Sequence, residues 1–190
     1  ISFFIIMKNT FKKEDFNSPD GMLTSVWGPS LWHSLHAVSF NYPTKPTLEQ
    51  KKHYLSFFKS LKNILPCKYC RINYVNNLKV VPLTMKTMKN RESLSLWLYN
   101  LHEEINKMLG KTSNLTYAEV RERYEMFRSR CLEATQSKSK KTVKSKKNTK
   151  EKGCTTPYYG NKSRCVINIV PKSNKCKTFK IDKKCIVKRG

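Results

Sequence analysis

The sequence predicts an all-α domain of five helices between about residue 24 and residue 133. Apolar residues recur there at spacings of three and four, which is typical of one buried face of a helix. Two capping boxes, at Thr47 and Thr116, mark helix starts. No segment up to residue 133 has a convincing strand pattern, so a β fold is not expected.

The first helix is expected to begin at Thr24 and to bury two adjacent faces. One stripe at helical spacing consists of Trp27, Leu31, Leu35 and Val38, and a second stripe beside it of Gly28, Trp32 and His36. The segment "NYPTKPT" should end this helix, because two prolines so close together disfavour its continuation.

The second helix should start after Thr47, with Gln50 completing the capping box. Its apolar face is formed by Leu48, Leu55, Phe58, Leu61 and Leu65. Pro66 suits the first turn of a third helix, where its missing N–H has no partner to lose. This placement would put Cys67 and Cys70 in that first turn.

The fourth helix is predicted from about Arg91 to Leu109, with Gly110 as its C-terminal stop. Its apolar side carries Leu94, Trp97, Leu101, Ile105 and Met108. Thr116 and Glu119 cap the fifth helix. Its apolar side carries Tyr117, Val120, Tyr124, Phe127 and Cys131.

Charge and composition separate this core from the rest of the chain. Residues 1–135 hold 20 Lys and Arg against 11 Asp and Glu, whereas residues 136–190 hold 18 against 2. We expect an N-terminal extension at 1–21, a domain at 22–133, a basic linker at 134–153 and a Cys-containing extension at 154–190. The linker cannot bury enough apolar surface to order itself, and the last segment contains short β-prone pieces.

The N-terminus begins with only about seven apolar residues and resembles neither a signal peptide nor a membrane span. Met7 is an alternative start. The sequence therefore predicts a soluble, unsecreted protein, in which a stable disulfide framework is not the default expectation. The seven cysteines are an odd number, so at least one is unpaired, paired between chains or catalytic.

Three kinds of site are compatible with the spacing of Cys67 and Cys70: a zinc half-site, a structural disulfide or a redox pair. A helix N-terminus stabilises a thiolate, and Lys68 and Arg71 add positive charge, which favours the redox pair. A second CxxC or HxxxH at finger-like spacing is absent, which disfavours zinc. Taken singly, a Trp and Leu stripe or a lone histidine more often belongs to the core than to a cofactor site.

Four motifs together resemble the Erv/ALR family of flavin-dependent sulfhydryl oxidases. They are "WGPSLWHSLH" at 27–36, "YP" at 42–43, "PCKYC" at 66–70 and "LWLYNLHEEINKMLGK" at 96–111. The resemblance covers about residues 24–131 and implies a four-helix bundle with a short fifth helix that binds FAD. It also implies an enzyme that passes electrons from protein thiols through the CxxC to FAD and then to O2, giving H2O2.

The resemblance assigns roles to individual positions. Cys70 would face the flavin, and Cys67 would exchange disulfides with substrate. The positions that correspond to FAD-binding residues are Trp27, Gly28, Trp32, His36, His102, Asn106, Lys111, Tyr117 and Tyr124. Lys111 would lie near the phosphates, and the two tyrosines would pack on the cofactor. No metal is implied.

Two positions depart from the family pattern. Glu103 replaces an asparagine and either removes a hydrogen bond to the cofactor or faces solvent. Leu101 and Asn100 stand where cellular members carry a cysteine of a structural disulfide. Its absence is more like the viral members, which implies a host cytoplasm or a virion as the place of action.

The basic extension allows several functions. Cys154, Cys165, Cys176 and Cys185 are candidates for a shuttle that relays electrons to the CxxC. A disulfide-stapled module that recognises substrate, a solvated linker, a nuclear-import patch and weak nucleic-acid binding are alternatives. The resemblance also implies a homodimer and protein thiol substrates, including a thioredoxin-like carrier. The competing hypothesis is a flavin-less nucleic-acid-binding or scaffold protein.

Overall fold

Helices dominate the described part of the chain. The computed structural model describes residues 12–130, residue 154 and residues 156–158. Its elements are α1 (Lys13–Phe16), α2 (Thr24–Phe40), α3 (Leu48–Ile64), α4 (Lys68–Val80), α5 (Arg91–Met108), α6 (Tyr117–Glu125), β1 (Ser129–Arg130) and β2 (Thr156–Pro157). The predicted all-α class is therefore confirmed.

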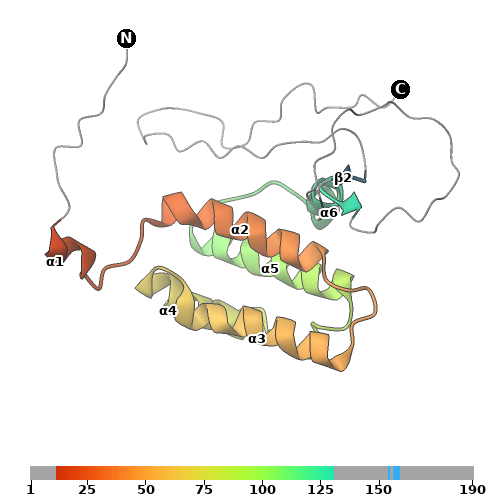
Figure 1. Ribbon diagram of the computed structural model, residues 1–190, viewed down its shortest axis with the longest axis horizontal. Helices are drawn as coiled ribbons and strands as arrows, with labels where there is room; N and C mark the ends of the chain where they lie inside the picture. The colour runs from red at the N-terminus through yellow and green to blue at the C-terminus, as the bar shows by residue number, and fades with distance from the viewer. Residues whose placement is uncertain (1–11, 131–153, 155, 159–190) are drawn as a thin grey trace, which may run out of the picture.

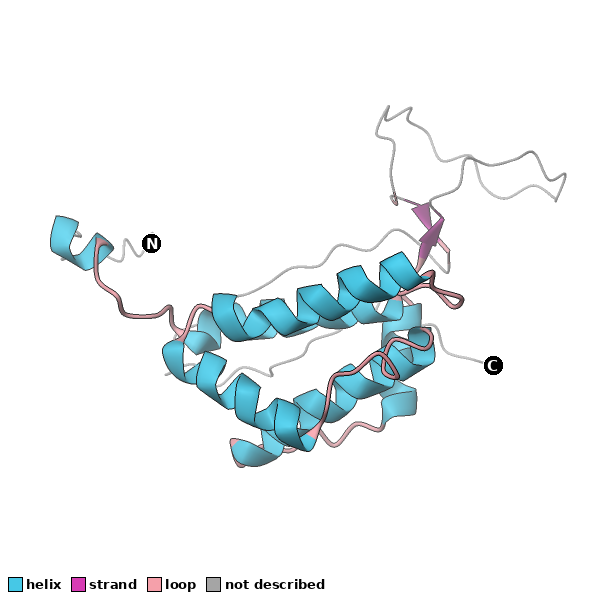
Figure 2. Cartoon of the chain, turned by 90° about the horizontal axis from the view of Figure 1, so that it is seen from below, coloured by secondary structure: helices cyan, strands magenta, loops and turns pink. Residues whose placement is uncertain are grey.

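Helices α2 to α5 form a four-helix bundle in two layers (Figure 1). Helix α2 packs along α5, α3 packs along α4, and α4 also contacts α5. The short helix α6 packs on α2 and is seen almost end-on in Figure 1. Figure 2 shows the same bundle from below, with α1 projecting away from it on the N-terminal side. The four-helix bundle with a short additional helix agrees with the prediction.

Local capping signals determine where three of these helices begin or end. At the start of α3, Gln50 N–H donates to Thr47 Oγ1 over 3.2 Å, and Thr47 N–H donates to Gln50 Oε1 over 2.9 Å. Thr116 and Glu119 form the same reciprocal pair at α6. Gly110 follows α5 with a φ of 63°, which favours glycine. All three predictions are confirmed.

Helix α4 begins two residues later than predicted. Pro66 is not in its first turn, because Cys67 is the N-cap and Lys68 the first helical residue. The N-cap function is taken by sulfur, since the Cys67 thiol accepts the Cys70 backbone N–H over 3.3 Å. Cys67 therefore precedes the helix, while Cys70 lies in its first turn.

Three further expectations differ from the structure. Residues 13–16 form the short helix α1, although irregular chain was expected there. Helix α6 ends at Glu125, so Phe127 lies beyond it. A strand was not expected before residue 133, but β1 pairs with β2 in an antiparallel ladder. Cys131 lies outside the described residues, as do residues 134–153 and most of 154–190, so the predicted domain boundaries stay predictions.

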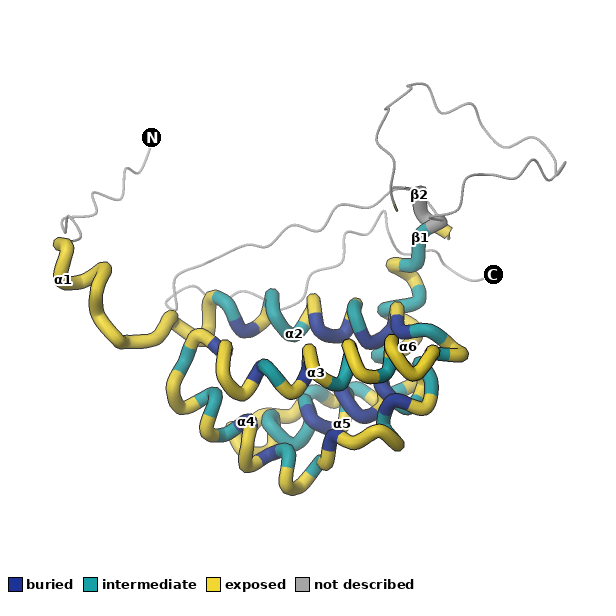
Figure 3. The backbone as a smooth tube through the Cα atoms, turned by 60° about the horizontal axis from the view of Figure 1, so that its bottom comes forward, coloured by how far each residue is buried: buried dark blue, intermediate teal, exposed yellow. Residues whose placement is uncertain are grey.

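The hydrophobic core lies between the two helix layers. Figure 3 shows the buried positions of α2, α3 and α5 facing inward. Phe58, Leu94 and Leu98 are fully buried at its centre. Two buried tyrosines are anchored to main chain: Tyr42 donates its hydroxyl to Met88 O over 3.0 Å, and Tyr74 donates to Phe58 O over 2.8 Å. Burial without an unpaired hydroxyl makes both rings favourable core residues.

The sequence predicts no membrane-spanning segment, and this prediction can be compared with the described residues alone. Within them, every helix is too short or too polar to cross a bilayer.

Candidate functional site

The two thiols lie at the N-terminal end of α4, next to the start of α2. Both Cys67 and Cys70 are free thiols and partly buried. Cys70 packs against the hydrophobic core, together with Trp27 and Trp32 of α2. The pair thus lies at the end of the bundle, and its second thiol, Cys70, contacts the bundle interior.

The environment separates the two thiols chemically. Hydrogen bonds from the thiol and backbone N–H of Cys70 lower the pKa of Cys67. Burial raises the pKa of Cys70, and the neighbouring Cys67 raises it further. In the dithiol form, Cys67 is therefore the thiol that loses its proton first as the pH rises. In disulfide exchange the thiolate is the form that attacks, and the thiol of lower pKa is the better leaving group.

The basic residues beside the pair contribute differently from the sequence expectation. The Arg71 guanidinium donates to the Leu65 carbonyl at the end of α3. This hydrogen bond connects Arg71 of α4 to the C-terminal end of α3. The lowered pKa of Cys67 comes from hydrogen bonds within the CxxC and from Thr24, together with the Tyr69 backbone.

Met22 and Thr24, just before and at the start of α2, lie against the residues of the CxxC segment, and sequence analysis did not identify either as a site residue. Met22 N–H donates to the Pro66 carbonyl over 2.7 Å. Trp27 Nε1 donates to the Met22 carbonyl over 2.9 Å. The Thr24 hydroxyl lies 3.9 Å from Cys70 Sγ. No spacing in the sequence indicates the Met22–Pro66 and Thr24–Cys70 contacts, because they join residues more than 40 positions apart.

A row of aromatic rings extends from the middle of α2 to α5 and α6. Trp32 stacks on His102 with ring centroids 3.9 Å apart and planes 5° from parallel. His36 stacks on Tyr124 at 5.2 Å, and Phe40 stacks on the same tyrosine at 5.2 Å. Four of the predicted cofactor-binding residues thus come together, and Phe40 is an addition to them.

The buried imidazole of His36 meets the partly buried imidazole of His102 inside this row. His36 Nε2 lies 3.1 Å from His102 Nδ1, a distance at which one nitrogen donates and the other accepts. Burial lowers the pKa of His36 to about 3, helped by the charge of His102, and lowers the pKa of His102 to about 4. Both rings are therefore neutral near pH 7.

One nitrogen of this pair lacks a partner. Among the described side chains, His36 Nδ1 is the buried polar atom without a hydrogen bond. A buried polar group of this kind costs stability unless something satisfies it. The stacked rings and this nitrogen together suit a flat aromatic ligand with polar edges.

The C-terminal part of α5 contains the next group of predicted residues. Asn106 Nδ2 donates to Glu103 Oε1 over 3.1 Å. Glu103 is partly buried, so its carboxylate orients the Asn106 amide instead of simply facing solvent. Glu103, Lys107 and Lys111 are among the residues that line a cavity of about 670 Å³ here. Lys111 is exposed.

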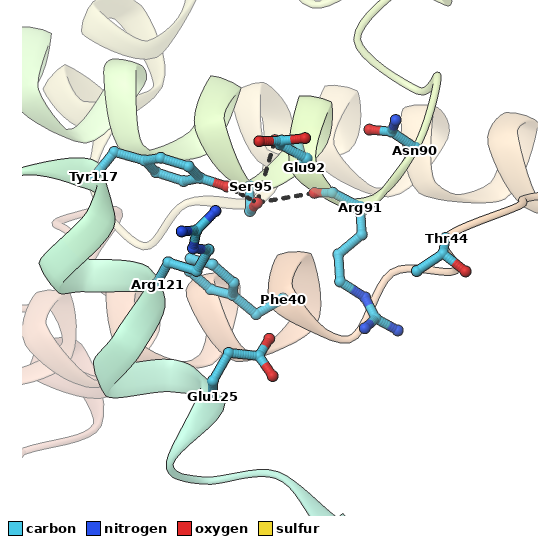
Figure 4. Close-up of a pocket in the computed structure, with 9 residues that line it drawn as sticks. All are labelled: Phe40, Thr44, Asn90, Arg91, Glu92, Ser95, Tyr117, Arg121 and Glu125. Atoms are coloured by element: carbon cyan, nitrogen blue, oxygen red, sulfur yellow. Dashed lines mark hydrogen bonds between the residues drawn. The ribbon is translucent and has the colours of Figure 1, made fainter.

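Tyr117 lies apart from the imidazole pair, beside a second cavity of about 270 Å³ (Figure 4). Its hydroxyl is 2.8 Å from Ser95 Oγ, which donates to the Arg91 carbonyl. Figure 4 shows Tyr117 and Arg121 from α6 facing Ser95 and Arg91 of α5. Tyr117 is linked to the aromatic row through Phe40, with ring centroids 6.3 Å apart.

Metal binding was one of the two interpretations of the thiol pair that competed with a redox pair, the other being a structural disulfide. In the part of the chain that the structure describes, His, Cys, Asp and Glu side chains nowhere gather in threes that could hold a metal ion.

Cys154 is disulfide-bonded, and the other shuttle candidates, Cys165, Cys176 and Cys185, lie outside the described residues.

Comparison with known proteins relates the helical core to a protein family. The profile of the Erv1 / Alr family matches residues 29–125. A mimivirus protein named "Probable FAD-linked sulfhydryl oxidase" is 42% identical over 104 residues, which span 55% of this chain and 72% of that protein. The FAD-linked sulfhydryl oxidase of an African swine fever virus isolate from Kenya is 28% identical over 99 residues, which span 52% of this chain and 80% of that protein.

A solved structure gives a further likeness. The FAD-binding domain of Erv1 from Saccharomyces cerevisiae superposes with a TM-score of 0.49 at 27% identity, covering 54% of this chain and 94% of that one. Family membership rests on the sequence matches, because the family profile spans more than half of the 190 residues. The chain belongs to the Erv1/Alr family.

Proposed function

We propose that this chain is an FAD-dependent thiol oxidase that forms disulfide bonds in protein substrates. The observation that carries the proposal is a CxxC in which one thiol has a lowered pKa and the other packs against the core, on the same bundle as a row of stacked aromatic rings. Family membership and the names of the mimiviral and African swine fever virus relatives support the same activity.

The residues of the aromatic row fit FAD. Isoalloxazine and adenine are flat aromatic rings with polar edges, and the row offers parallel ring faces beside an unsatisfied His36 Nδ1. The lowered pKa values keep both imidazoles neutral, so each provides one donor and one acceptor without a buried charge. These properties suit a neutral ring better than a cation or an anion.

Most of the chain's contribution to the cofactor would be binding and orientation. The proposed FAD-holding residues are Trp27, Gly28, Trp32, His36, His102, Asn106, Lys111, Tyr117 and Tyr124. Trp32, His36, His102 and Tyr124 would hold an aromatic ring. Lys111 would approach the phosphates, next to the cavity at the end of α5.

The thiol chemistry follows from the asymmetry of the pair. In the oxidised enzyme, a substrate thiolate attacks Cys67 Sγ, which breaks the Cys67–Cys70 bond and releases Cys70 as a thiolate. The substrate's second thiolate then attacks the substrate's first sulfur, which is bonded to Cys67 Sγ in the mixed disulfide. That step forms the substrate disulfide and releases Cys67, whose lowered pKa makes it the faster leaving group.

Each cycle leaves the pair as a dithiol that holds two electrons taken from the substrate. Cys70 is the thiol that packs against the core beside Trp27 and Trp32, so it would pass these electrons inward. When bound, FAD supplies two-electron oxidation of the dithiol and delivery of the electrons to O2, giving H2O2.

The finer assignments are also proposals. We propose protein thiols as substrates, a thioredoxin-like carrier among them, and a homodimer as the assembly. The viral relatives and the missing family cysteine at positions 100 and 101 support action in a host cytoplasm or virion. The cysteines of 154–190 would act as a shuttle, and the basic linker leaves room for weak nucleic-acid binding.

Purified full-length protein tests the activity. We expect a yellow protein that releases FAD on denaturation, consumes O2 when dithiothreitol is added and produces H2O2. A Cys67→Ser and Cys70→Ser double variant provides the matched control and should retain FAD without consuming O2. A colourless protein with no thiol-dependent O2 uptake would contradict the proposal and support the flavin-less scaffold instead.

A further inference from the structure

The segment that leads into α2 is tied to the CxxC segment by one hydrogen bond and to α2 by another. We call residues 20–24 the strap. Its Met22 N–H donates to the Pro66 carbonyl over 2.7 Å, and its Met22 carbonyl accepts from Trp27 Nε1 over 2.9 Å. The N-terminal ends of α2 and α4 lie at the same end of the bundle, where the strap joins them (Figure 1).

The strap approaches the CxxC so closely that one position has no room for a side chain. A Cβ added to Gly21 would lie 2.6 Å from the Pro66 carbonyl oxygen and 3.0 Å from Cys67 Cα. Both atoms belong to main chain, so relief requires the backbone of the strap or of residues 66–67 to move. Glycine at position 21 thus allows the Met22–Pro66 hydrogen bond to form.

The strap also brings a hydroxyl to the second sulfur. Thr24 is the first residue of α2, and its Oγ1 lies 3.9 Å from Cys70 Sγ, within reach of the long hydrogen bonds that sulfur makes. Its hydroxyl lowers the pKa of both Cys67 and Cys70. For Cys70, this effect opposes the burial that raises the pKa.

From these contacts we propose that the strap positions the thiol pair, with Gly21 and Met22 fixing the main chain at Cys67 and Thr24 donating a hydrogen bond to the Cys70 sulfur. Thr24 touches a reacting atom and is therefore a catalytic residue, whereas Gly21 is a positioning residue. An effect of the strap on turnover depends on the proposed oxidase function. Its effect on the two thiols does not, because their reactivity can be measured without oxidase activity.

Thr24→Val tests the hydroxyl, since valine keeps the shape and removes the donor. The anaerobically reduced full-length protein is alkylated with iodoacetamide across a pH series, and the rate at each thiol is followed by peptide mass spectrometry. Trypsin separates the two thiols, because Lys68 places Cys67 in "NILPCK" and Cys70 in "YCR".

We expect Thr24→Val to raise the alkylation midpoints of both thiols by roughly 0.5 to 1 pH unit, as loss of a hydrogen bond to a charged group predicts. At pH 7 this corresponds to alkylation about threefold to tenfold slower. Thr24→Ser, which keeps the hydroxyl, should restore the wild-type profile. Identical profiles for wild type, Thr24→Val and Thr24→Ser would overturn the role of Thr24, even if the protein proves to be an active oxidase.

Gly21→Ala tests the anchor, with Asn17→Ala as the matched control. Asn17 is exposed and lies in the same segment outside the strap. Because the added methyl forces the strap and residues 66–67 apart, we expect at least about threefold slower Cys67 alkylation at pH 7, from a loss of the hydrogen bonds that stabilise its thiolate. Asn17→Ala should match wild type. Equal rates in Gly21→Ala and Asn17→Ala, with both proteins folded by circular dichroism, would overturn the anchoring role.

Discussion

The imidazole pair of His36 and His102 predicts a steep loss of stability in mild acid. The pKa of His36 is about 3 and that of His102 about 4 in the folded chain, against 6.5 for a histidine in unfolded chain. Below pH 6.5 the unfolded state binds more protons than the folded state, so the free energy of unfolding falls as the pH falls. The stabilising effect is complete above pH 6.5 and is lost progressively toward pH 3.

The size of the effect follows from these pKa values. At pH 5 an unfolded histidine is almost fully protonated, whereas both folded imidazoles remain mostly neutral. Relative to pH 8, each ring then lowers the free energy of unfolding by about 2 kcal/mol, and the pair by about 4 kcal/mol. That is a large share of the stability of a small domain.

Urea unfolding of wild type, His36→Gln and His102→Gln at pH 8 and pH 5 measures this difference. Each variant should lose roughly half of the pH dependence, about 2 kcal/mol, whatever its stability at pH 8. His53→Gln is the matched control, because His53 is exposed and its Nε2 lies 3.5 Å from the equally exposed Glu49 Oε1. A His36→Gln protein with the full wild-type pH dependence would refute the assignment of two imidazoles that stay neutral in the folded protein.

Three further predictions concern packing, capping and the extension. Phe58→Ala should lower the free energy of unfolding by about 3 to 5 kcal/mol, because Phe58 is fully buried, and Phe57→Ala, which removes a 41% exposed ring, should cost much less in the same urea titration. Thr116→Ala should cost about 1 kcal/mol through loss of the cap with Glu119, and an unchanged urea midpoint would contradict it. Deleting residues 136–190 should preserve O2 uptake with dithiothreitol and slow it with a reduced protein substrate; equal rates on both would discard the shuttle.

The helices of the bundle were predictable because their signals are local. Each capping box joins residues three positions apart, and the apolar stripes repeat within single helices. Gly110 could be predicted as a stop because its left-handed backbone favours glycine wherever the helix packs. These features do not depend on which helix becomes the neighbour of which.

The start of α4 was misplaced because two local preferences compete there. Proline is favoured in the first turn of a helix, which predicted Pro66 as a helical residue. In the structure the Cys67 sulfur takes the cap and moves the start to Lys68. The two-residue strand β1 was missed for a different reason, since it forms by pairing with residues 156–157 and has no pattern of its own.

The candidate site could be predicted only in part. The motifs indicated the CxxC and the ring-bearing positions, but not how they meet. The contact between His36 and His102 joins residues 66 positions apart, and that between Thr24 and Cys70 joins residues 46 apart. Such pairs depend on how α2 lies against α4 and α5, which periodicity does not define. The strap was missed for this reason.

The most direct test of the central claim follows electrons from the thiols to the flavin in the absence of O2. Wild-type protein and Cys70→Ser, both loaded with FAD, are mixed anaerobically with excess dithiothreitol while flavin absorbance is recorded. We predict rapid bleaching of the wild-type flavin and an essentially unbleached flavin in Cys70→Ser. Bleaching at the same rate in both proteins would contradict the account, because electrons would then reach the cofactor without passing through Cys70.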